Sequence, residues 1–121
     1  MYTGVFTLKT QLDTLSWLCI LESKLQSIRA FYRFKLQQDW DESSELTLIE
    51  ESVINAGNAY GCFLYAHQRD ALPPLSERSR ALLCSINGLG QEIHPYFWDQ
   101  AVQEGIDDAC CDRALAALES A

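Results

Sequence analysis

The sequence contains little that could carry catalytic chemistry. Its 121 residues include two histidines, His67 and His94, and neither has a Ser or Cys nucleophile or a metal-ligand pattern nearby. Cys110 and Cys111 are adjacent, which is neither the CxxC spacing nor a usual zinc arrangement. The stretch NGLGQE holds two glycines but follows a predicted helix, and it lacks the Lys and the Ser or Thr of a phosphate loop. We therefore predict a protein that is not an enzyme and that has no metal site and no cofactor.

Long hydrophobic runs are also missing. No apolar stretch approaches the length that spans a bilayer, and the N-terminus lacks the basic region, apolar block and small-residue cleavage site of a secretory signal. The five cysteines are odd in number and irregularly spaced, which favours reduced, buried thiols over a disulfide framework. These features predict a soluble, cytoplasmic protein.

Basic residues are scarce, and one long region has none. Between Leu36 and Gln68 the chain contains no Lys or Arg, and the stretch DWDESSELTLIEES within it, residues 39–52, carries six carboxylates. The formal net charge of the whole chain is -8, which argues against binding to nucleic-acid phosphates or to an anionic membrane surface. The charge suits attraction to a cationic protein, although a solvated helix face would have the same composition.

The charge is uneven along the chain. Residues 8–38 carry five bases and two acids, whereas residues 39–121 carry four bases and fifteen acids. The stretch FYRFK, residues 31–35, mixes aromatic and basic side chains as a nucleic-acid surface does. Because the rest of the molecule is acidic, we expect this stretch to pack on the acidic segment or to pair with it.

Helical periodicity, by contrast, is abundant. The length of the chain and its 48% apolar and 21% charged residues fit one folded domain, residues 1–121. From Leu8 to Leu36 apolar residues recur at steps of three and four, which is the period of an amphipathic helix. A second apolar stripe predicts that this helix lies centrally or is partly buried in a homodimer. The stripe comprises Trp17, Ile20, Phe31 and Phe34.

A second helix is predicted from about Glu45 to Asp70. Gly57 and Gly61 stand one turn apart in it, which predicts a close crossing with another helix. His67 ends the predicted core row, and we interpret it as a structural histidine. The full core row is Leu46, Ile49, Val53, Ala56, Tyr60, Phe63 and His67. The opposite row forms a mixed polar and aromatic face of Leu48, Glu51, Asn55, Asn58, Cys62 and Tyr65.

A third helix follows the stretch LPPL. Pro74 and the proline before it end the second helix, because proline removes a donor and restricts the residue that precedes it. Ser76 is placed to cap the next helix with its side-chain oxygen. We expect this helix to fray at NGLG, residues 87–90.

The remainder of the chain predicts two more helices. The stretch HPYFWDQAVQEG, residues 94–105, places Pro95 in the first turn of a short helix and Gly105 just past its end. His94 then either caps this helix or is simply exposed. A last helix begins at Asp107, and no alternating strand pattern competes. The predicted fold class is all-α, a bundle of four to five helices.

Three segments, in their order along the chain, resemble a known family. They are ESKLQSIRAFYRFKLQ in the first helix, LTLIEESVINAGNAYGCFLYAHQRD in the second and LPPLSERSRALLCSI around the third. The shared features are the helix end from Lys24 to Arg29, the acid that closes the second helix, and the pattern around Pro74, Ser76 and Leu82. In these features the chain resembles the small all-helical immunity proteins of bacterial type VI secretion that protect against an NAD(P)+ glycohydrolase toxin.

The resemblance implies that the protein is an antitoxin. Such a protein binds its toxin in the cytosol and blocks the active site, with acidic residues meeting the basic groups that the toxin uses on a phosphate-bearing substrate. The base-free region and the polar row of the second helix lead us to predict the contact surface. It comprises Trp40, Asp41, Glu42, Glu45, Glu51, Asn55, Asn58 and Tyr65.

Two other functions fit the same sequence features. The first is an acidic inhibitor that mimics the charge of DNA, such as a phage or anti-defence protein, and duplex DNA would displace it from its target. The second is a helical scaffold or secretion chaperone, which would bind an unfolded segment and not a folded catalytic domain.

Overall fold

Helices make up nearly all of the chain that the structure describes. The structure is a computed structural model, and it describes residues 11–36, 43–68 and 74–106. Within these ranges there are four helices and no strand, so the predicted all-α bundle is confirmed. The predicted last helix from Asp107 lies outside the described residues. The four helices are α1 (Gln11–Leu36), α2 (Ser43–Gln68), α3 (Glu77–Ile93) and α4 (Pro95–Gly105).

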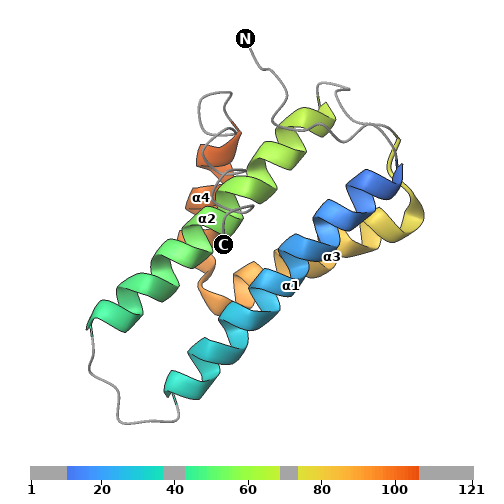
Figure 1. The fold of residues 1–121 in the computed structure, drawn as a ribbon. Coiled ribbons are helices and arrows are strands. Elements are labelled where there is room, and N and C mark those ends of the chain that lie inside the picture. The colour runs from blue at the N-terminus through green and yellow to red at the C-terminus, as the bar shows by residue number, and fades with distance from the viewer. Residues whose placement is uncertain (1–10, 37–42, 69–73, 107–121) are drawn as a thin grey trace.

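The two long helices each pair with one of the shorter ones. Helix α1 packs mainly against α3, and α2 packs mainly against α4, as Figure 1 shows. Helices α1 and α2 also contact each other, which joins the two pairs into one bundle. Helix α2 contacts α1, α3 and α4, and its largest contact is with α4.

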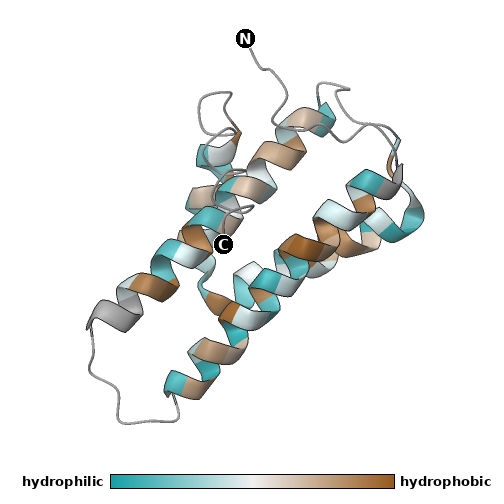
Figure 2. Ribbon diagram, in the orientation of Figure 1, coloured by the Kyte–Doolittle hydropathy of each residue, from teal (hydrophilic) through white to brown (hydrophobic). Residues whose placement is uncertain are grey.

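The core is built from the apolar rows that the spacing of three and four predicts. Leu18, Leu21 and Leu25 of α1 are fully buried, as are Val53 and Phe63 of α2. Figure 2 shows hydrophobic and hydrophilic residues alternating along the helices, as an amphipathic pattern requires. Removing each such side chain from water contributes about 2 kcal/mol, so these rows determine which face of each helix points inward.

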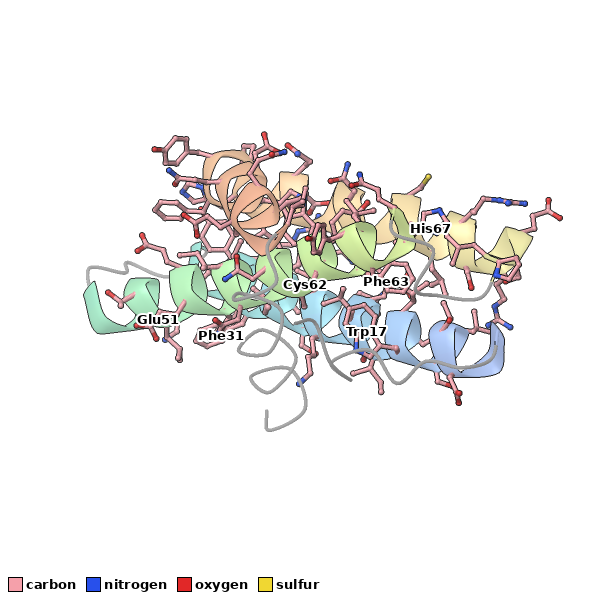
Figure 3. All side chains as sticks on the ribbon, turned by 90° about the horizontal axis from the view of Figure 1, so that it is seen from above. Trp17, Phe31, Glu51, Cys62, Phe63 and His67 are labelled. Atoms are coloured by element: carbon pink, nitrogen blue, oxygen red, sulfur yellow. The ribbon has the colours of Figure 1, made fainter. Side chains whose placement is uncertain are left out.

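The second apolar stripe of α1 is mostly exposed. Trp17 is buried and its ring stacks on that of Phe63, with 5.2 Å between the ring centroids (Figure 3). Ile20 and Phe34, however, are 52% and 54% exposed, and Phe31 is also exposed. Among the described helices α1 therefore does not lie centrally, because its neighbours cover mainly one of its sides. The alternative expectation, a homodimer through α1, stays a prediction.

The predicted close crossing on α2 is confirmed, and α4 is the helix that crosses there. A Cβ atom at Gly61 would lie 2.2 Å from the carbonyl oxygen of Val102, and one at Gly57 would lie 2.7 Å from the Cβ of Ala101. From the other side, a Cβ at Gly105 would lie 2.3 Å from the carbonyl oxygen of Asn58. Real Cβ atoms do not approach so closely, so glycine is what allows the two backbones to touch.

Helix α3 continues through the glycines at which fraying was expected. It continues to Ile93. The reason is that Gly90 is buried against the ring of Trp98, which is itself fully buried. A Cβ at Gly90 would lie 2.0 Å from the Cδ2 atom of that ring. The indole Nε1 of Trp98 also donates a hydrogen bond to Asn87 Oδ1 at 2.8 Å. This tertiary contact stabilises the last turns of the helix, and no local signal in the sequence reports it.

The predicted starts of α3 and α4 are confirmed. The Ser79 backbone N–H donates to Ser76 Oγ at 3.1 Å, which caps α3. The Phe97 N–H donates to His94 Nδ1 at 3.3 Å, and the two rings stack with their centroids 4.2 Å apart. His94 therefore caps α4, which has Pro95 in its first turn.

Two expectations about single side chains are wrong. His67 is exposed, since it lies one turn beyond Phe63 at the end of α2, where the core row reaches solvent (Figure 3). The thiol of Cys84 is also exposed, whereas Cys62 is buried and Cys19 is half-buried. None of these three cysteines is in a disulfide, and the other two cysteines lie outside the described residues.

The basic end of α1 pairs with α3. Arg33 forms an ion pair with Glu92, and Arg29 NH1 lies 3.5 Å from the same carboxylate. The side chains of residues 39–46, which carry four of the six carboxylates of the acidic segment, lie outside the described part of the chain, so the expected contact of FYRFK with that segment stays a prediction. None of the helices in those ranges has the length and apolar composition that crossing a bilayer requires.

Candidate protein-binding site

The N-terminal half of α2 presents a short exposed row. Leu48, Glu51 and Asn55 are separated by steps of three and four, so they share one face of the helix. All three are exposed, and the Leu48 side chain, at 56%, is among the most exposed large apolar groups in the described ranges. A solvent-facing leucine beside a carboxylate and an amide is a combination suited to contact with another protein.

The carboxylates beside this row have no basic partner within the described part of the chain. The ion pairs found there both use Glu92 of α3, and α2 itself contains no Lys or Arg. Glu51 is exposed and Glu50 is half-buried. Their negative charge is therefore directed at solvent, where it can attract a cationic surface.

Exposed aromatic side chains lie on α1 at the same end of the bundle. Figure 3 shows Glu51 of α2 and Phe31 of α1 towards this end. Phe34 is also exposed there, and the Nζ atom of Lys35 lies 5.6 Å and 6.0 Å from the ring centroids of Phe31 and Phe34. We refer to these five exposed residues, Phe31, Phe34, Leu48, Glu51 and Asn55, as the α1–α2 end.

The structure divides the predicted contact residues. Glu51 and Asn55 are exposed, whereas Asn58 and Tyr65 are half-buried. Glu45 lies in α2, but its side chain is outside the described part. The other predicted contact residues, Trp40, Asp41 and Glu42, also lie outside the described residues.

The polar row of α2 is not one continuous open face. Cys62, in the middle of its C-terminal half, is 1% exposed and belongs to the hydrophobic core. The Asn58 backbone touches Gly105 where α4 crosses, and the Asn58 Oδ1 atom is buried without a hydrogen-bond donor in the described ranges. Tyr65 packs against the core cluster. The exposed part of the row therefore ends at Asn55.

Sequence reasoning did not assign Leu48, Phe31 or Phe34 to the contact surface. The sequence pattern places Leu48 on the polar row of the second helix and the two phenylalanines on the second apolar stripe of the first helix. One signal could have identified Leu48, since it stands three residues before Glu51 in a base-free helix and outside the core row. The exposure of the phenylalanines depends on where α2 and α3 lie around α1, which their spacing does not report.

The α1–α2 end consists of a carboxylate, three apolar side chains and an amide group, from Glu51, from Phe31, Phe34 and Leu48, and from Asn55. The described part of the chain includes no group of three His, Cys, Asp or Glu side chains that could hold a metal ion. His94 accepts the hydrogen bond that caps α4, and His67 stands alone at the end of α2. The arrangement at the α1–α2 end is therefore one for binding through surface complementarity.

Comparisons with protein-family models, with curated proteins and with solved structures give no match to this chain.

Proposed function

We propose that the protein is an immunity protein that binds a cognate bacterial toxin domain in the cytosol and blocks its active site. One observation carries the proposal: Glu51 and Asn55 are exposed on a helix without bases, next to the exposed side chain of Leu48. The resemblance of the three helical segments to type VI immunity proteins supplies the class of partner.

The surface chemistry supports a two-part mode of binding. The acidic residues attract a basic toxin surface and raise the association rate, in a way that weakens as salt rises. Leu48 and the neighbouring aromatic rings supply apolar area, and burying it slows dissociation. These carboxylates can pair with the basic groups that a toxin uses to hold a phosphate-bearing substrate. When the carboxylates occupy those groups, the substrate cannot bind.

The test begins with capture of a partner from native cytosol and continues with the captured protein made in recombinant form. That protein must arrest cell growth when it is expressed alone, and co-expression of the present chain must restore growth. Its affinity is then measured for Glu51→Lys and for a matched control, Glu104→Lys, which makes the same charge change at an exposed site on α4.

We expect Glu51→Lys to weaken toxin binding by roughly 10-fold or more, mainly through the association rate, while Glu104→Lys binds as the original does. Equal affinity of the two variants would contradict the proposed surface. A captured protein that is harmless to cells would contradict the antitoxin function itself. Displacement of the partner by duplex DNA would identify a charge mimic instead.

A further inference from the structure

We infer that Asn87 of α3 is a site of spontaneous deamidation, which Trp98 protects in the folded protein and which reacts when the last turns of α3 open. The chain has three asparagines, and Asn87 is the one that precedes a glycine, Gly88. Asn55 and Asn58 each precede an alanine. Because glycine has no side chain, its amide nitrogen can approach the preceding side chain without obstruction. The inference goes beyond the proposed function, because it requires no toxin.

The reaction needs only the chain itself, a base in solution and water. The Gly88 amide nitrogen loses its proton to the base and attacks the side-chain carbonyl carbon of Asn87. The bond from that carbon to Nδ2 breaks and ammonia leaves, which closes a succinimide ring. Water then adds to one of the two carbonyl carbons of the ring and opens it, which leaves aspartate or isoaspartate at position 87.

Neither solvent access nor space prevents this reaction in the folded protein. Asn87 and Gly88 are both exposed, so water and base can reach them. A Cβ atom at Gly88 would meet nothing within 4 Å, so the surroundings of the attacking nitrogen are open. Protection of Asn87 must therefore come from the conformation of α3.

The helical backbone separates the two reacting atoms. Helix α3 runs from Glu77 to Ile93, so Asn87 and Gly88 lie inside it. In an α-helix each side chain leans towards the N-terminus, whereas the next amide nitrogen lies on the C-terminal side and donates its proton to the carbonyl four residues back. The Gly88 nitrogen therefore reaches the Asn87 side chain only when this turn opens.

Trp98 of α4 keeps the turn closed. Its indole Nε1 donates a hydrogen bond to Asn87 Oδ1 at 2.8 Å, which fixes the side chain that would react. Its ring is fully buried and packs against Gly90, in the next turn of α3. The two glycines at positions 88 and 90 lower the helix propensity of this stretch, so opening is opposed mainly by the contacts of Trp98.

The isoaspartate product would make the opening permanent. Isoaspartate adds a methylene group to the main chain, which displaces the helix hydrogen bonds that span position 87. The turn can then no longer place Gly90 against the Trp98 ring. A brief opening of α3 would thus become a lasting loss of its contact with α4.

The test is mass spectrometry of the full chain after incubation at mildly alkaline pH, in native buffer and in urea that unfolds it. Trypsin cleaves after Arg80 and Arg113, which releases Asn87 in a peptide without another asparagine, and Asn55 lies in a different peptide. In urea we expect Asn87 to react at least about 10-fold faster than Asn55, because glycine follows it. In native buffer Asn87 should react at least about 100-fold more slowly than in urea, because it must wait for opening.

Two results of this comparison would overturn the inference. Equal rates for Asn87 in native buffer and in urea would mean that α3 does not protect it. Equal rates for Asn87 and Asn55 in urea would mean that position 87 is not a preferred site. Gly88→Ala checks the attacking group, because its Cβ should slow the reaction in urea at least about 10-fold. An unchanged rate for Gly88→Ala would contradict attack by that nitrogen.

Trp98→Phe tests the protection by Trp98. This variant lacks the indole donor, so Asn87 should react about 10-fold faster than in the original chain in native buffer and at the same rate in urea. The control for lost global stability is Leu18→Ala, which removes a fully buried side chain of α1. When the two variants are compared at urea concentrations that give equal free energies of unfolding, Trp98→Phe should still react faster. Equal rates there would mean that global unfolding exposes Asn87, and the protective role of Trp98 would be overturned.

Discussion

The α2–α4 crossing and the α1–α2 end use large side chains in opposite ways. At the crossing, glycines of both helices bring the backbones into contact, and the Trp98 ring fills the space beside Gly90. At the α1–α2 end, Phe34 and Leu48 are more than half exposed. One region thus encloses its largest aromatic side chain, and the other leaves comparable apolar groups in solvent.

The difference separates what stabilises the fold from what is available for binding. Apolar groups at the crossing have already lost their contact with water and contribute to folding. Apolar groups at the α1–α2 end contribute little to the stability of the fold, because they remain in water. They can contribute to the free energy of binding when a partner covers them. Variants in the two regions should therefore affect different measurements.

The largest effect is expected from Trp98→Ala. The Trp98 ring is fully buried, it packs against Gly90 and lies 5.4 Å from the Tyr60 ring, and it donates a hydrogen bond to Asn87. Removing it leaves a cavity among buried groups, so we expect the free energy of unfolding to fall by about 3–5 kcal/mol. Urea unfolding followed by far-ultraviolet circular dichroism measures the change.

Two further variants complete the test of this prediction. Trp98→Phe leaves a smaller cavity and should lose less stability, which allows a measurement even if Trp98→Ala does not fold. Leu48→Ala removes an apolar side chain from the α1–α2 end and should change the free energy of unfolding by less than about 0.5 kcal/mol. Similar losses for Leu48→Ala and Trp98→Phe would remove the distinction between the two regions.

A smaller effect is expected from Gly61→Ala. The new Cβ would lie 2.2 Å from the Val102 carbonyl oxygen, so α4 must move away as a backbone unit. The strain exceeds the gain in helix propensity, and we expect a net loss of about 2 kcal/mol in the free energy of unfolding.

Gly88 of α3 provides the matched control for this substitution. A Cβ there would meet nothing within 4 Å, so Gly88→Ala should stabilise the protein by about 0.5–1 kcal/mol through helix propensity alone. If both alanine variants gained stability, the backbones would not be in contact at the crossing.

The two regions also differ in how much of them the sequence could predict. The core rows of α1 and α2 follow from apolar spacing, and Gly57 with Gly61 predicted the crossing because two glycines one turn apart leave a flat helix surface. The continuation of α3 past NGLG could not be predicted, because it depends on Trp98 packing against Gly90. Local propensity at that glycine favours an end, and a tertiary contact overrides it.

The candidate site was predictable only in part. Exposure of Glu51 and Asn55 follows from their position opposite the core row. Half-burial of Asn58 depends on the exact point at which α4 crosses α2, which the sequence of α2 alone does not encode. The exposure of Phe31 and Phe34 likewise depends on which side of α1 the other helices cover.

The smallest effect concerns a polar group at the edge of the crossing. The Tyr60 hydroxyl donates to the Leu83 carbonyl at 3.3 Å, so Tyr60→Phe should lower the free energy of unfolding by about 1 kcal/mol near neutral pH. Burial raises the pKa of Tyr60 above its ordinary value of 10.0, and the nearby Cys84 thiolate raises it further. The folded protein therefore holds the phenolic proton more tightly than the unfolded chain does.

This difference in pKa determines the sign of the pH dependence. Above about pH 10 the unfolded chain loses the Tyr60 proton first, so the native state becomes less stable as pH rises towards the folded pKa. Tyr60→Phe lacks this loss, and its stability should fall less steeply than that of the original chain when unfolding is measured from about pH 8 to about pH 11. Cys84→Ser should make the original dependence shallower, because it removes the second cause of the shift. Parallel curves for the original chain and Tyr60→Phe would mean that solvent reaches the Tyr60 hydroxyl, and the dense packing of the crossing would then stop at the Trp98 ring.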